Sequence, residues 1–201
     1  MKILIIGRNF GLKSHYAVLK KKFKNSQIYL ACNNYSKKKS KIHIIANYKN
    51  LLLKENIDLI SCCTNVVEQE KFLNFFIKKN IKTKYLMLEK PISTKIDHIK
   101  KINSYCLKNN IFWNVNFSYS NLSIFKILKK NLLKKKNITL NYKLNFKHSY
   151  FKKKTDNWKN FSMLGGGINF YYLIHVYFVI NKIFKNIHIN KINTKLEKIN
   201  L

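Results

Sequence analysis

The first 117 residues alternate short apolar runs with longer segments whose apolar residues recur at helical spacing, such as Phe72, Phe75 and Phe76. The expected strands are residues 3–7, 27–32, 41–46, 59–64, 85–89 and 111–117, and the expected helices are residues 12–24, 50–54, 67–79 and 94–109. Strands that alternate with helices build parallel sheets with both faces covered. This half therefore predicts an α/β fold with a doubly wound parallel sheet.

The pattern changes after about residue 117. Residues 138–146 alternate strictly between apolar and polar side chains, as a strand does when one face is buried and the other is wet. We expect helices over 122–135 and from the triple glycine to about 184, and a last strand over 187–192. The sequence thus predicts one domain over 1–118 and an incomplete α+β domain with a partly antiparallel sheet over 119–201.

The net charge of +32 suggests nucleic-acid binding, but the kind of basic residue argues against it. Arg8 is the only arginine, and the other 39 basic residues are lysines spread along the chain. Arginine is the side chain suited to bidentate phosphate and guanine contacts. We therefore expect solvated lysines and no specific nucleic-acid partner.

The apolar segments predict neither membrane attachment nor export. The longest apolar run, residues 171–180, is half of the roughly 20 residues that a membrane span needs. The apolar run after Met1 is too short for a signal peptide, so we expect a cytoplasmic protein. None of the four cysteines forms a Cys-x-x-Cys pair, which favours reduced thiols and no metal site.

A glycine-flanked turn follows the first expected strand. Gly7-Arg8-Asn9-Phe10-Gly11 joins that strand to the first helix, where glycines allow a pyrophosphate to approach backbone N–H groups. Asn9 stands where the second glycine of this Rossmann motif is usual. The turn predicts dinucleotide binding; a simple turn in another α/β fold is the alternative.

The end of the second strand leaves the choice of dinucleotide open. A carboxylate usually binds the ribose hydroxyls here, but the sequence has none. Asn33 or Asn34 can hydrogen-bond the ribose, whereas residues 37–39, all lysine, can attract a 2′-phosphate. We therefore expect NAD or NADP as the cofactor.

Three further segments resemble the glucose–fructose oxidoreductase / inositol dehydrogenase (Gfo/Idh/MocA) family. They are residues 57–64, the Glu89-Lys90-Pro91 tripeptide, and Gly165-Gly166-Gly167 with His175 eight residues on. The resemblance implies NAD(P)-dependent hydride transfer on a sugar, nucleotide sugar or polyol, within carbohydrate metabolism. The second domain would then hold the substrate or form the oligomer interface.

The resemblance also assigns roles to residues. Lys90 and His175 would be acid/base groups, because a desolvated lysine and a histidine both titrate near neutrality. Thr64, Asn65 and Glu89 would join Lys90 and the glycine turn around the cofactor. Tyr171 falls where the family has a catalytic aspartate, and it shares a helix face with His175.

Two departures support a second reading. A tyrosine does not replace a carboxylate at neutral pH, and family members continue well beyond residue 201. The alternative is a truncated, catalytically impaired homologue that retains nucleotide binding. Exposed sheet edges in the second domain would also favour a homo-oligomer.

Overall fold

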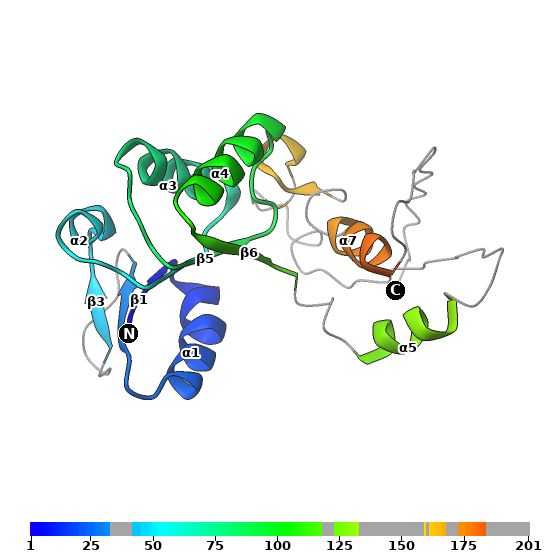
Figure 1. The fold of residues 1–201 in the computed structure, drawn as a ribbon, viewed down its shortest axis with the longest axis horizontal. Helices are drawn as coiled ribbons and strands as arrows, with labels where there is room; N and C mark the ends of the chain where they lie inside the picture. The colour runs from blue at the N-terminus through cyan, green and yellow to red at the C-terminus, as the bar shows by residue number, and fades with distance from the viewer. Residues whose placement is uncertain (33–41, 118–122, 133–158, 160, 168–172, 184–201) are drawn as a thin grey trace, which may run out of the picture.

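The computed structural model describes residues 1–32, 42–117, 123–132, 159, 161–167 and 173–183. Six parallel strands form one sheet in the order β3-β2-β1-β4-β5-β6 (Figure 1). The strands are β1 (Lys2–Ile6), β2 (Gln27–Ala31), β3 (His43–Ile45), β4 (Leu59–Cys62), β5 (Tyr85–Glu89) and β6 (Phe112–Asn116). This order reverses direction between β1 and β4 and is that of a Rossmann sheet, as the sequence predicts.

Helices connect the strands on both sides of the sheet (Figure 1). They are η1 (Gly11–Tyr16, a π-helix) continued by α1 (Ala17–Lys22), then α2 (Tyr48–Lys54), α3 (Val66–Lys78) and α4 (Ile96–Lys108). Every expected element of this half is present, and its bounds differ from the prediction by a few residues.

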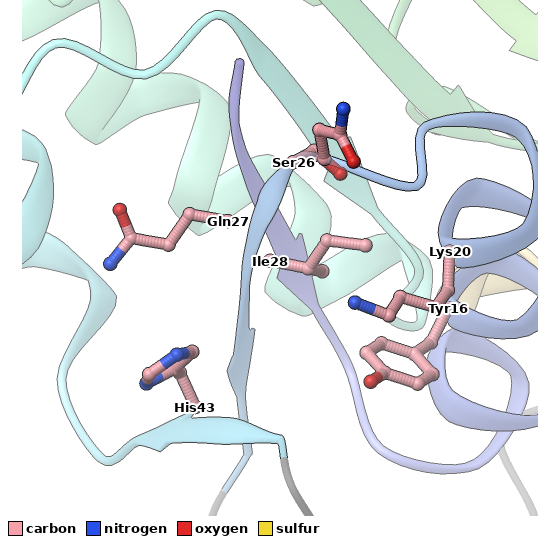
Figure 2. A pocket seen from close by; sticks show the side chains of 7 residues that line it. Tyr16, Lys20, Ser26, Gln27, Ile28 and His43 are labelled. Atoms are coloured by element: carbon pink, nitrogen blue, oxygen red, sulfur yellow. The ribbon is translucent and has the colours of Figure 1, made fainter.

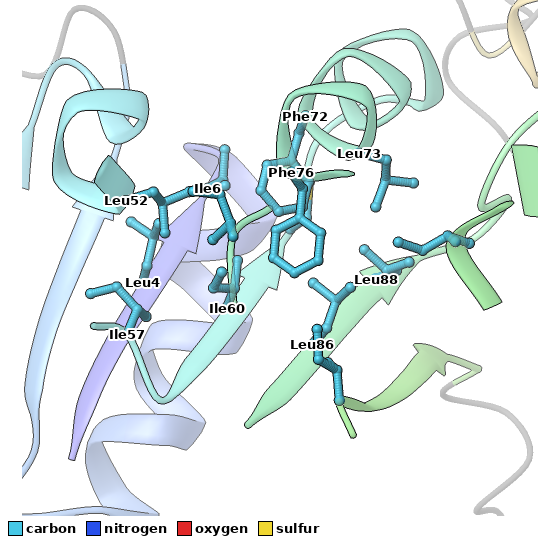
Figure 3. Packing of buried hydrophobic residues seen from close by; sticks show 14 of the residues in the cluster. Leu4, Ile6, Leu52, Ile57, Ile60, Phe72, Leu73, Phe76, Leu86 and Leu88 are labelled. Carbon is cyan, nitrogen blue, oxygen red and sulfur yellow. The ribbon is translucent and has the colours of Figure 1, made fainter. Parts of the chain in front are cut away.

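Alternation along β1 divides the core into two layers. Leu4 and Ile6 face α2, α3 and α4, whereas Ile3 and Ile5 face α1, because successive strand residues point to opposite faces. Figure 3 shows the larger layer, in which Phe72 and Phe76 of α3 lie over the sheet. Both phenylalanines are fully buried.

At one corner of the sheet the described residues cover only one of the two faces. Among the described residues no helix covers β5 and β6 on the α1 side, where Tyr85 and Phe112 are 48% and 69% exposed. A cavity of about 370 Å³ lies against this corner and is lined mainly by apolar side chains. Four connecting helices divide unequally between two faces, and α1 alone cannot span six strands.

The second half is described in part. It contains α5 (Ser123–Leu132), the 3₁₀ turn η5 (Ser162–Leu164) and α7 (Ile174–Ile183). The expected strands over 138–146 and 187–192 lie outside the described residues. No helix within the described ranges combines the length and apolar character needed to cross a bilayer.

We expect Phe76→Ala to lower the free energy of unfolding by about 3–5 kcal/mol, because it leaves a cavity in the larger core layer. Leu107→Ala on the exposed face of α4 is the control and should change it by less than about 0.5 kcal/mol. Chemical denaturation followed by circular dichroism measures both. Equal losses in the two variants would contradict this packing.

Candidate active site

The glycine turn is fixed between the ends of three strands. Gly7 has φ +127°, and a Cβ there would overlap the backbone oxygen of Cys63, which follows β4. Its N–H donates to the carbonyl of Ala31 at the end of β2, 3.0 Å away. Only glycine meets both the conformation and the close approach. A Cβ on Gly11 would lie 3.1 Å from Ile5, so this glycine lets the helix start close to the sheet.

The three residues inside the turn face solvent. Arg8, Asn9 and Phe10 are exposed, and Asn9 does not have a positive φ. The tolerance of asparagine for left-handed backbone is therefore not used at Asn9. The turn leaves its outer surface open beside the carboxyl ends of β1 and β2.

The two residues predicted after β4 have local partners. Asn65 caps α3, since its side-chain oxygen accepts a hydrogen bond from the Glu68 N–H at 2.9 Å. Thr64 lies with its hydroxyl 3.4 Å from the Cys62 sulfur. The structure thus shows a helix-capping role for Asn65, while its backbone stays at the carboxyl edge of the sheet.

A buried glutamine holds the segment that follows β5. The Gln69 side-chain oxygen accepts from the Glu89 N–H at 2.9 Å, and its nitrogen donates to the Glu89 carbonyl, also at 2.9 Å. The same nitrogen contacts the carbonyl oxygens of Pro91 and Ile92, each at 3.1 Å. Gln69 is fully buried, and the Lys90–Pro91 peptide bond is cis. One amide therefore fixes the backbone on both sides of Lys90.

The Glu89 carboxylate is held by side chains other than Gln69. One oxygen accepts from the Asn116 amide at 2.7 Å and lies 3.1 Å from Nε2 of His15. Nδ1 of His15 lies 2.7 Å from the Ser61 hydroxyl. With its proton on Nε2, a neutral His15 donates to Glu89 and accepts from Ser61, which pairs both ring nitrogens.

Sequence reasoning missed this network of His15, Ser61, Glu89 and Asn116. It assigned Glu89 to the cofactor and gave no role to Ser61 or Asn116. A histidine on the buried side of the first helix was the available signal, since a buried imidazole needs polar partners.

The charge of Lys90 acts on the His175 ring, so the two side chains lie in the same part of the structure. Burial lowers the pKa of Lys90 to about 8; the charge of Glu89 opposes this shift and that of Lys159 adds to it. Burial also lowers the pKa of His175 to about 4, and the charge of Lys90 contributes. Near neutral pH, His175 is therefore uncharged, and Lys90 exists as both the ammonium and the neutral amine.

The triple glycine packs against the segment held by Gln69. A Cβ on Gly165, which has φ +76°, would lie 2.5 Å from Val66 and 3.1 Å from Pro91. Farther along, the ring of Phe117 stacks on Phe178 of α7 at 3.9 Å and meets His175 edge-on at 6.0 Å. These contacts bring α7 to the carboxyl edge of the sheet.

The first 117 residues match the model of an oxidoreductase family with an NAD-binding Rossmann fold. The chain belongs to the Gfo/Idh/MocA family. None of the curated protein sequences matches it.

Solved structures with the same fold include a putative dehydrogenase from Bordetella bronchiseptica RB50, with TM-score 0.67, 15% identity, and coverage of 91% of this chain and 49% of that one. An NAD-binding protein from Listeria innocua has TM-score 0.64, 15% identity, and coverage of 92% and 55%. The WlbA dehydrogenase from Chromobacterium violaceum, in complex with NADH and UDP-GlcNAcA, has TM-score 0.56, 12% identity, and coverage of 67% and 40%. This chain spans 40% to 55% of the length of these structures.

Some predicted site residues of this Gfo/Idh/MocA chain lie outside the described residues. They are Asn33, Asn34 and Tyr171, whose roles stay predictions. Within the described ranges no three His, Cys, Asp or Glu side chains gather in a way that would hold a metal ion.

A cavity of about 300 Å³ lies away from the glycine turn and Lys90. It is lined by side chains of η1, α1, β2 and β3 and the turn before β2, among them Tyr16, Lys20 and His43 (Figure 2). None of the predicted site residues lines it. This cavity therefore plays no part in the candidate active site.

Gln69→Glu tests the role of the buried amide. The change keeps the shape of the side chain but replaces the donating nitrogen with an acceptor, which leaves up to three carbonyl oxygens without a partner. We expect a loss of at least about 2 kcal/mol in the free energy of unfolding. The exposed Asn103→Asp on α4 is the matched amide-to-carboxylate control. A loss no larger than that of the control would contradict the role of Gln69.

Proposed function

We propose that this chain is an NAD(P)-dependent oxidoreductase that transfers hydride at a secondary alcohol or ketone of a sugar, nucleotide sugar or polyol. The observation that carries the proposal is Lys90, a partly buried amine with a pKa of about 8 at the carboxyl end of β5. It lies beside a neutral His175 and on the same sheet edge as the glycine turn. Ligands of open α/β sheets bind at this edge.

The glycine turn fits a dinucleotide. Gly7 presses against Cys63 where a larger residue would not fit, and residues 8–10, where the chain enters the helix of η1 and α1, are exposed. We assign Gly7, Arg8, Asn9, Phe10 and Gly11 to the pyrophosphate, where N–H groups at a helix start favour anions. Asn33 and Asn34 would bind the adenosine ribose. The bound cofactor supplies the nicotinamide ring that exchanges hydride with the substrate.

Lys90 would handle the proton. In the oxidative direction the neutral Lys90 amine accepts the hydroxyl proton of the substrate while hydride leaves its carbon, which leaves a carbonyl and an ammonium. In the reductive direction the ammonium returns that proton to the forming alkoxide. A pKa of about 8 serves both directions near neutral pH, because an acid/base group works best when its pKa lies near the operating pH.

His175 would orient Lys90 or the substrate and would not itself carry the proton. With its pKa near 4 it is a weak base at neutral pH, but its neutral ring can accept a hydrogen bond from Lys90 or the substrate. The family resemblance implies an acid/base role for His175, and we limit that role to accepting a hydrogen bond. Tyr171, four residues earlier, would add a hydroxyl group to the same site.

The substrate class is the least direct part of the proposal. Support comes from the fold shared with a dehydrogenase whose structure contains NADH and UDP-GlcNAcA. We place the cofactor on a domain over 1–118 and the substrate on residues 119–201, which include Gly165 and His175. We also propose that the chain forms a homo-oligomer through its second domain.

Titration of the purified protein with NADH and NADPH, followed by nicotinamide fluorescence, tests this function. We expect saturable binding that Lys90→Ala weakens, because Lys90 would lie at the nicotinamide end of the site. Lys82→Ala, an exposed lysine just before β5, is the charge-matched control and should leave binding unchanged.

The outcomes separate the two readings of the sequence. A folded protein that binds neither nicotinamide cofactor is not an oxidoreductase of this type. Binding without turnover across sugars, nucleotide sugars and polyols would favour the catalytically impaired homologue. Turnover that Lys90→Ala abolishes would support the enzyme.

The pKa of Lys90 can be measured directly by labelling lysines with ¹³C-formaldehyde and following the dimethylamine resonances by NMR. We expect one resonance to titrate near pH 8 while exposed lysines titrate above 10. Because burial disfavours the ammonium form, this group should lose its proton as the pH rises through 8. Lys90→Arg should remove that resonance; if all resonances titrate above 10, the assignment is wrong.

A further inference from the structure

Arg8 stands one residue after Gly7, where the turn passes the end of β2. The register of β1 and β2 pairs Ile6 with Ala31, and the Gly7 N–H donates to the Ala31 carbonyl at 3.0 Å. These two contacts hold the backbone that leads into Arg8 against the end of β2. The Arg8 side chain is exposed there.

The electrostatics of Cys32, the first residue after β2, agree with this placement. Burial raises the pKa of the Cys32 thiol, and the charge of Arg8 lowers it. The guanidinium is therefore close enough to act on the residue that follows the strand. No ion pair among the described residues engages Arg8.

The end of the second strand is where a Rossmann domain distinguishes its two nicotinamide cofactors. A carboxylate there binds the 2′-hydroxyl of NAD, whereas a nearby arginine accommodates the 2′-phosphate of NADP. This sequence has no carboxylate before Glu55, so none of its first 54 residues binds the hydroxyl in that way or repels a phosphate.

The composition of the chain makes this arginine informative. Of 40 basic residues, 39 are lysine, and the single arginine is the one beside β2. A guanidinium offers two parallel N–H donors that match two phosphate oxygens, which an ammonium cannot do. The one arginine of the chain thus stands beside the strand end at which Rossmann domains distinguish the two cofactors.

We propose that Arg8 is a specificity residue that binds the 2′-phosphate and makes this protein prefer NADP(H) to NAD(H). The inference rests on the proposed function, since it names the cofactor of the same site. The backbone N–H of Arg8 would serve the pyrophosphate, and its side chain would bind the 2′-phosphate.

Binding of NADPH and NADH to the wild type and to Arg8→Gln, measured by nicotinamide fluorescence at 150 mM salt, tests the proposal. We expect NADPH to bind at least about tenfold more tightly than NADH. Arg8→Gln should weaken NADPH by about 10- to 100-fold, the worth of a charge-assisted contact, and change NADH by less than about twofold. Arg8→Lys should fall between the wild type and Arg8→Gln for NADPH.

A second substitution controls for the general positive charge of the protein. Lys13 is exposed in η1, and Lys13→Gln removes the same charge without touching the end of β2. It should change both affinities by less than about twofold. Thermal melts of the variants establish that each is folded.

The results separate this inference from the proposed function. NADH binding as tight as NADPH binding, or Arg8→Gln weakening both cofactors alike, would overturn the role of Arg8 and leave the oxidoreductase intact. No binding of either cofactor to folded wild-type protein would overturn both.

Discussion

The position of Glu89 is the constraint on which the rest of the site depends. Its backbone is fixed by both polar atoms of Gln69, and its carboxylate is held by His15 and Asn116. These partners come from α3, the first helix and β6, so one residue ties three elements to the end of β5. A buried amide whose oxygen and nitrogen are both paired, as in Gln69, favours one arrangement, because a shift leaves a desolvated atom without a partner. Lys90, the next residue, takes its position from this arrangement.

Around Lys90 the cost of burying charge outweighs the attraction of the nearest carboxylate. Glu89 favours the ammonium form, but burial and the charge of Lys159 act against it, and the pKa falls to about 8. One oxygen of Glu89 accepts a hydrogen bond from Asn116 and lies 3.1 Å from Nε2 of His15. The pKa of Lys90 is thus the balance of burial and Lys159 against the charge of Glu89.

Glycine determines how closely the separate parts of the chain approach this edge. Gly7 lets the first turn rest on Cys63, and Gly165 lets the second half of the chain rest on Val66 and Pro91. Both have positive φ, so each contributes a backbone shape as well as the absence of a side chain. The charge of Lys90, which follows β5, acts on His175 of α7. Of the five glycines of the chain, Gly7 and Gly165 combine a positive φ with a close contact.

The sequence by itself determined the strands and helices of the first half, the Rossmann sheet and the members of the glycine turn and the Glu89-Lys90-Pro91 segment. Hydrophobic periodicity encodes those elements locally, since it is set by neighbours two to four positions apart. Only the tertiary structure decided that Gln69 clamps Glu89, that Asn65 caps a helix, and that Arg8 lies beside the end of β2. His15 meets Ser61 and Glu89 across 46 and 74 residues of chain, and no local pattern records such a pairing. Long-range polar contacts depend on the register and twist of the assembled sheet, so they appear only once the chain has folded.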